Sequence, residues 1–107
     1  MDPVVCLVTT PPDRARPIAA ALVERELVAC VNIVAGVQSV YRWQGAVEYD
    51  EESLLVIKTT GDAVAALNEA LAELHPYETF ELVALDVAGG SPDYLDWIGQ
   101  VVALPER

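Results

Sequence analysis

Alternation between strand-like and helix-like segments is the feature that most constrains the fold of this chain. Residues 4–8 form a short, β-branched, apolar run that predicts a central strand, and Pro11-Pro12 stops it. From Asp13 to Glu26 the apolar residues recur at helical spacing. Asp13 is a candidate N-cap, whereas Pro17 fits a first turn better than a helix interior, so we expect the helix to begin a few residues late.

The centre of the chain has the pattern of one long hairpin. Apolar extended runs cover residues 27–34 and 37–43, with Gly36 as a bend or bulge between them. Gln44-Gly45 is a turn signal, strand signal resumes at residues 46–47, and a strongly β run follows at 54–59. The acidic stretch at 48–52 between these runs is typical of a solvated strand edge.

The second half repeats the strand–helix alternation. A second helix is predicted to begin near Thr60 or Asp62, either of which can cap it, and Pro76 ends it near His75. A fourth strand is predicted at 82–87, and Ser91 followed by proline opens a short third helix. The order β-α-β-β-α-β predicts a ferredoxin-like α+β fold in a single domain, 1–107, with two helices on one face of an antiparallel sheet. Four apolar residues define the stripe of the second helix: Val64, Leu67, Leu71 and Leu74.

Composition narrows the class of partner. Of 107 residues, 17 are acidic and 6 basic, so the net charge of −11 disfavours nucleic acid and anionic membrane surfaces and favours a cation, or serves only solubility. With 53% hydrophobic residues, a small chain has more apolar surface than its own core can bury, which predicts a subunit interface. The absence of a spanning apolar run, of a basic leader and of a disulfide framework predicts a cytoplasmic protein.

Five short motifs occur in a fixed order along the chain. Together they resemble the CutA family of divalent-cation tolerance proteins, over roughly residues 4–97. The motifs are Ala29-Cys30-Val31-Asn32-Ile33, Ser39-Val40-Tyr41-Arg42-Trp43-Gln44-Gly45, Lys58-Thr59, His75-Pro76-Tyr77-Glu78 and Tyr94-Leu95-Asp96-Trp97.

The resemblance implies a tight homotrimer similar to the PII signalling proteins, in which sheets of neighbouring subunits join edge to edge and leave clefts between them. It also implies an association with copper or another divalent cation, a link to acetylcholinesterase anchoring in animal relatives, and no firm catalytic activity. The chain departs from the family pattern at Phe80, where relatives often have proline. Val8 and Leu74 stand where some copper-linked bacterial relatives carry cysteine and histidine.

The candidate functional residues are of two kinds: polar or charged residues that can bind an ion, and aromatic residues. His75, the sole histidine, sits at a helix end, where it either caps carbonyls or binds a divalent ion together with Glu78 or Glu81. Cys30 is either a small buried hydrophobe or a further ligand. Lys58 suits an ion pair with Glu48, Glu51 or Glu52, or an anionic ligand. The remaining aromatic candidates, which suit a subunit interface or a ligand cleft, are Tyr41, Trp43, Tyr77 and Trp97.

Three functional hypotheses remain open from the sequence. The first is a cytoplasmic, trimeric metal-response protein without a firmly bound cofactor; the second is a PII-like regulator that binds a small ligand in the cleft between subunits. The third is a purely structural trimer. An acylphosphatase-type enzyme is disfavoured, because Pro11-Pro12 replaces the glycine-rich phosphate loop that such chemistry needs beside Arg14 and Asn32.

Overall fold

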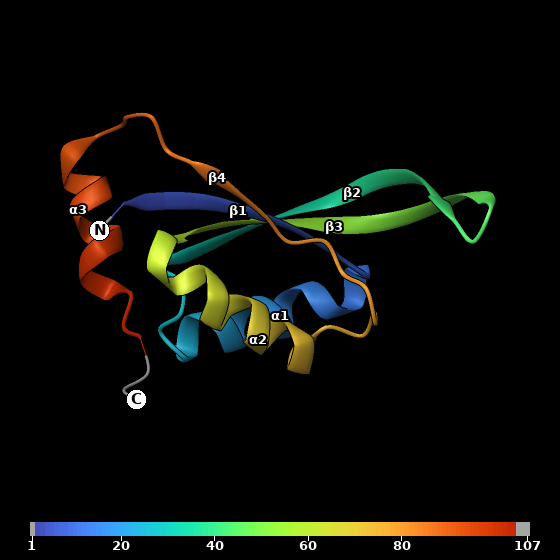
Figure 1. Ribbon diagram of the computed structural model, residues 1–107, viewed down its shortest axis with the longest axis horizontal. Coiled ribbons are helices and arrows are strands. Elements are labelled where there is room, and N and C mark those ends of the chain that lie inside the picture. Colours follow the sequence, from blue (N-terminus) through green and yellow to red (C-terminus); the bar gives the residue numbers. More distant parts are fainter. Residues whose placement is uncertain (1, 105–107) are drawn as a thin grey trace.

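A computed structural model describes residues 2–104 and places a layer of two helices beneath a four-stranded sheet, with a third helix at one end (Figure 1). Short 3-10 turns, η1 and η2, precede the first two helices. In chain order the elements are β1 (Pro3–Thr10), η1 (Pro12–Arg14), α1 (Ala15–Glu24), β2 (Cys30–Trp43), β3 (Ala46–Thr60), η2 (Gly61–Ala63), α2 (Val64–Leu74), β4 (Val83–Asp86) and α3 (Pro92–Val101).

The sheet has the strand order β2-β3-β1-β4, and every neighbouring pair is antiparallel. β1 and β3 are the central strands, aligned so that Val8 lies opposite Leu55. Because β1 and β2 are separated by β3, the connection through α1 is a split βαβ unit, and the same holds for the second half through α2. The predicted ferredoxin-like α+β arrangement is therefore confirmed.

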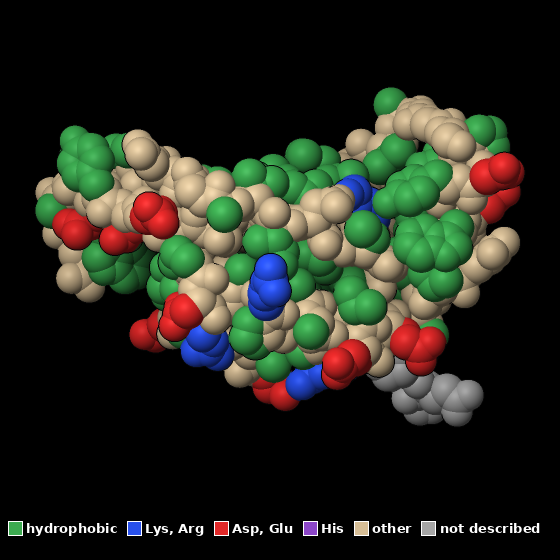
Figure 2. Space-filling view, turned by 180° about the vertical axis from the view of Figure 1, so that it is seen from behind, with side chains coloured by type: hydrophobic (Ala, Val, Ile, Leu, Met, Phe, Trp, Pro, Cys, Tyr) green, Lys and Arg blue, Asp and Glu red, His purple; other side chains and the backbone are tan. Residues whose placement is uncertain are grey.

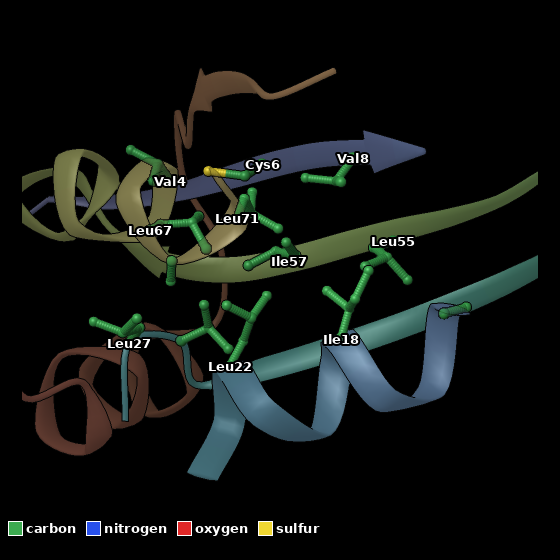
Figure 3. Packing of buried hydrophobic residues seen from close by; sticks show 13 residues of the cluster. Val4, Cys6, Val8, Ile18, Leu22, Leu27, Leu55, Ile57, Leu67 and Leu71 are labelled. Atoms are coloured by element: carbon green, nitrogen blue, oxygen red, sulfur yellow. The ribbon is translucent and has the colours of Figure 1, made fainter. Parts of the chain in front are cut away.

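The core forms where buried side chains alternate with more exposed ones along the central strands β1 and β3. Side chains on one face of β1 and β3 are buried and point toward the helices, and Figure 3 shows them meeting the apolar stripes of α1 and α2. Helical spacing places one apolar face of each helix over the sheet. The contacting residues include Cys6, Val8, Leu55 and Ile57 of the sheet, and Ile18, Leu22, Leu67 and Leu71 of the helices.

β2 and β3 continue far beyond the helix layer as a two-stranded arm (Figure 1), defined here as residues 37–52. At its base the register shifts between Val34 and Val37, where Gly36 has a φ of +74° that a side chain would strain. The arm ends in the predicted turn, with Gln44 and Gly45 both at positive φ. The expected long hairpin with a bulge at Gly36 is confirmed.

Several predicted boundaries are wrong by a few residues. Asp13 is not an N-cap, because it lies inside η1, which closes through the Arg14 amide donating to the Pro11 carbonyl at 3.0 Å. The expected late start of this helix is confirmed, because α1 starts at Ala15 and Pro17 falls in its first turn, where the missing N–H has no partner to lose. β2 starts at Cys30, later than residue 27, because the chain first descends from α1 through a turn.

Of the later helix caps, the one predicted for the second helix is absent, whereas Ser91 holds the predicted position before α3, without a side-chain cap bond. Thr60 donates its hydroxyl to Asp62 at 2.6 Å, and neither side chain caps an amide of η2 or α2. Ser91 is the N-cap residue of α3 with Pro92 at the first helical position, as predicted. No helix within residues 2–104 is both long enough and apolar enough to cross a membrane.

Candidate functional site

A groove of about 550 Å³ lies where three segments meet: the end of β1, the base of the arm, and the segment of residues 75–81 that follows α2. The segment reaches this position because α2 ends at Leu74 and the chain must cross the end of β1 before it forms β4 (Figure 1). The residues that line the groove are Thr9, Ser39, Val40, Tyr41, Trp43, Glu52, Tyr77, Glu78, Thr79 and Glu81.

His75 ties this segment to β1 from beneath the groove. Its ring is buried, with Nδ1 accepting the Tyr77 amide proton at 3.1 Å and Nε2 lying 2.8 Å from the Thr9 carbonyl oxygen. An amide donates and a carbonyl accepts, so Nδ1 is bare and Nε2 carries the proton: the geometry assigns a neutral imidazole. The ring also stacks on Phe80, with centroids 5.3 Å apart. His75 therefore acts as a two-ended hydrogen-bonding tether.

Tyrosine hydroxyls connect the groove walls to carboxylates. Tyr77 donates to Glu52 at 3.0 Å and thereby joins the 75–81 segment to the arm, while Tyr41 donates to Asp50 within the arm. Burial first, and then the bond to Glu52, raises the pKa of Tyr77 to about 12. The bond to Asp50 is the largest cause that raises the pKa of Tyr41, also to about 12. Both hydroxyls are committed donors, which leaves the ring faces as the available surface.

The groove is acidic and aromatic together. Three of its lining residues are carboxylates, Glu52, Glu78 and Glu81, and none is lysine, arginine or histidine. Glu52 is only 6% exposed, whereas the three aromatic side chains of the lining keep between 38% and 50% of their surface open to solvent. This surface offers acceptor oxygens and ring faces, both of which attract positive charge.

A second polar cluster lies elsewhere on the sheet, beside α3. Lys58 donates to the Asn32 side-chain oxygen, and the Cys30 thiol lies 3.9 Å from the same oxygen. Tyr94 approaches Cys30 and packs on Trp97 at 5.6 Å between ring centroids. Burial and, to a lesser degree, the Cys30 thiol raise the pKa of Tyr94.

The structure separates residues that the sequence treated as one set. Tyr41, Trp43 and Tyr77 meet at the groove with Glu78 and Glu81, whereas Lys58, Trp97 and Cys30 belong to the second cluster. On β3, Cys30 lies opposite Lys58 and Thr9 lies opposite Leu54. Lys58 and Leu54 are four residues apart, which corresponds to about 13 Å along the strand. Cys30 and the His75 tether are therefore not brought together.

Lys58 and Glu52 both differ from expectation. Lys58 contacts Asn32 and not the acidic stretch of the arm, so of its two predicted roles the ion pair is not formed within the described subunit, and the anionic ligand stays a prediction. Glu52 was grouped with that solvated stretch, yet it is buried at the groove wall. The sequence gives little sign that Glu52 is buried. Alternation along β3 places it on the same side of the strand as Glu48 and Asp50, which are exposed. Glu52 differs from them in lying where Tyr77 reaches the arm and donates to it.

The donor set of the groove does not suit a tightly held transition metal. Both ring nitrogens of His75 are already bonded, so a copper site built on it requires the loss of the Thr9 or Tyr77 bond. Among residues 2–104, no three His, Cys, Asp or Glu side chains converge on one metal position. Glu78 and Glu81 at the groove remain suitable oxygen donors for a weakly bound hard cation.

Comparison with known proteins identifies the class first. The fold is shared with solved CutA1 structures: the divalent cation tolerance protein of Thermus thermophilus aligns with a TM-score of 0.92 and 50% identity, over 94% of this chain and 99% of that one. The "PII-like protein CutA" of Nostoc aligns with a TM-score of 0.90 and 34% identity, over 95% and 99%. These neighbours define an α+β protein of the CutA1 and PII-like class.

Sequence comparison then gives the family. The profile of the CutA1 divalent ion tolerance protein matches residues 4–101, and this chain belongs to that family. The divalent-cation tolerance protein CutA of Thermus thermophilus is 54% identical over 95 residues, which cover 88% of this chain and 92% of the relative. Human protein CutA is 44% identical over 95 residues, and the match covers 88% of this chain and 53% of the human protein.

Proposed function

We propose that this chain is a homotrimeric, non-enzymatic protein of the divalent-cation response, and that the groove at the base of the arm is its ligand-binding element. The observation that carries the proposal is the groove itself: an acidic, aromatic cavity in a chain that belongs to the divalent ion tolerance family. His75 has no free ring nitrogen with which to act as a base, which supports a binding function over catalysis.

The arm supports the trimer. It is a two-stranded hairpin without a helix layer behind it, and such a hairpin is marginal in water by itself. Its surface outside the groove carries Val47 and Tyr49, which are 51% and 74% exposed. A second copy of the chain packing on this face supplies the missing cover, and the number three follows from the family resemblance.

The open face of the sheet adds further uncovered apolar surface. On β4, Val83 and Leu85 are 45% and 48% exposed and lie opposite Leu7 and Val5 of β1. Figure 2 shows hydrophobic side chains along the hollowed upper edge of the molecule, on the side of the sheet away from α1 and α2. Apolar surface of this extent is typical of a subunit interface.

The charge supports binding of divalent cations. The net charge is −11, and the groove concentrates three carboxylates where the arm meets the body. Glu78 and Glu81 supply oxygen ligands, so a divalent ion, copper included, binds weakly through them and not through the His75 ring. Calorimetric titration of magnesium and copper into wild type and Glu81→Gln tests this. Equal binding by both proteins contradicts it, and light scattering that gives a monomer contradicts the trimer.

The second candidate function is that of a PII-like regulator that itself binds a small molecule. The observation that favours it is the groove volume of about 550 Å³, because small-ligand sites span roughly 300–1,000 Å³ whereas a single water occupies only about 30 Å³. A groove of this size accommodates a molecule of several heavy atoms. The Nostoc neighbour that is named PII-like shares the fold.

A further inference from the structure

The buried carboxylate of Glu52 is the starting point, because no lysine, arginine or histidine side chain within residues 2–104 forms an ion pair with it. It is 6% exposed and receives one donor, the Tyr77 hydroxyl at 3.0 Å. An ionised carboxylate accepts up to about four hydrogen bonds, so much of its capacity faces the groove unused. Among the described residues the ion pair of the structure joins Arg25 to Glu73, at a different place on the helices. Among the described residues no side-chain oxygen is both buried and without a partner, so the second oxygen of Glu52 is open to the groove, where a positively charged ligand can reach it.

The walls beside Glu52 select the kind of cation. Tyr41, Trp43 and Tyr77 line the same groove and keep 38–50% of their surface open. Both tyrosine hydroxyls donate to carboxylates, so neither is free to donate to an anion. Ring faces attract ammonium and guanidinium groups through the quadrupole of the ring and contribute nothing to the inner shell of a metal ion.

The groove is too large for a lone inorganic ion to be the ligand that fits it best. The volume of about 550 Å³ is many times that of one ion with its ligands, and the described residues bring no three metal-ligating side chains together. An organic cation fills the aromatic part of the groove with its methylene groups and places its charge at Glu52. Glu78 and Glu81 line the same groove and suit a second positive charge.

We propose that the groove binds an organic ammonium ion, with an alkyl body against Tyr41, Trp43 and Tyr77 and a charged nitrogen at Glu52. This inference rests on the proposed function of the groove as the ligand-binding element and names the chemical class of its ligand. A free alkyl diamine is the occupant: its two charges match Glu52 and the Glu78–Glu81 side, and its chain is thin enough for an open groove.

The experiment uses three probes of matched size or charge on the whole protein in its native assembly. Calorimetric titrations compare 1,5-diaminopentane with 1,5-pentanediol, its neutral analogue, and with magnesium, which carries the same charge without an apolar body. We expect the diamine to bind and the diol not to bind. Equal binding of diamine and diol, or no diamine binding, overturns the proposal; the latter includes the case in which a basic side chain of another subunit fills the groove.

Variants locate the site and separate the two contributions. Glu52→Gln should weaken diamine binding about ten-fold, because it replaces a charge-assisted contact with a neutral one. Trp43→Leu should weaken diamine binding about three-fold and leave magnesium binding unchanged, because only the organic cation uses the ring. Glu69→Gln is the control, because it removes one negative charge, as Glu52→Gln does, at an exposed position of α2. Diamine binding that falls equally in Glu69→Gln and Glu52→Gln reflects bulk charge and overturns the proposal.

The outcomes also keep this inference apart from the proposed function. Magnesium or copper binding that depends on Glu81, without diamine binding, leaves the divalent-cation function standing and refutes the organic-cation inference. Diamine binding that depends on Glu52 and Trp43, without any response to divalent ions, supports the ligand class and refutes the divalent-cation proposal. A circular dichroism spectrum and the assembly state of each variant, unchanged from wild type, show that its loss of binding does not arise from unfolding.

Discussion

His75→Ala is the substitution that best separates a structural tether from a metal ligand. In the wild-type protein this ring makes two hydrogen bonds, to the Thr9 carbonyl and from the Tyr77 amide, and it stacks on Phe80. Alanine removes all three contacts and leaves the long bond from the Thr9 hydroxyl to Glu81, at 3.5 Å, as the remaining side-chain tie between β1 and the 75–81 segment. If His75 is a tether, the main effect is a loss of stability and of groove geometry, whatever metal is present.

The magnitude follows from the contacts. Each hydrogen bond contributes about 1 kcal/mol net, and the stacked, buried ring adds about 1 kcal/mol. Thr9 is half-buried and Tyr77 partly exposed, so water reaches the two groups left without a partner and little further penalty arises. The free energy of unfolding should therefore fall by about 3 kcal/mol. His75→Phe keeps a ring beside Phe80 and should cost about 2 kcal/mol, the share of the hydrogen bonds.

Urea unfolding followed by circular dichroism measures both changes, at one fixed protein concentration because the proposed trimer would make stability depend on concentration. Asn68→Ala, at an exposed position of α2 away from the groove, is the control and should change stability by less than about 0.5 kcal/mol. A loss below about 1 kcal/mol in His75→Ala, combined with a loss of copper affinity, refutes the tether and restores His75 as a ligand.

Three further predictions test the assembly, the tyrosines and the buried thiol. Val47→Asp should dissociate the proposed trimer at micromolar concentration in light scattering, because it places an unpaired charge in the proposed apolar interface; a trimer that stays intact would show that this face of the arm is free. Tyr41 and Tyr77, with their pKa raised to about 12, favour the fold below the unfolded tyrosine pKa of about 10, so stability should decline as pH rises through about 12. The tyrosinate absorbance of Tyr77→Phe should lack one late-titrating group, and a curve like that of wild type counts against the Glu52 bond. Cys6, which is fully buried with its pKa raised by burial, should react with a thiol reagent only in denaturant, whereas reaction in the native protein would place it at the surface.

The sequence by itself determined the order of elements and the family. Period-two and helical apolar spacing are local properties, so the strand at 4–8, the stripe from Val64 to Leu74 and the turn at Gln44-Gly45 could be predicted without knowledge of their neighbours. Element boundaries were less well predicted. At Asp13 and Cys30 the chain takes a 3-10 turn or a descending loop, where competing local hydrogen bonds decide the last residues.

Only the tertiary structure decided which side chains form the groove. Glu52 belongs to an acidic stretch that is otherwise exposed, and it is buried because Tyr77, 25 positions further along the chain, crosses the base of the arm and donates to it. His75 and Cys30 carry the two side chains most suited to a soft metal, yet the end of α2 holds His75 against Thr9, and sheet register places Cys30 opposite Lys58. Local pattern specifies strands and helices, but the path of the 75–81 segment across β1 depends on long-range packing that spacing along the sequence does not encode.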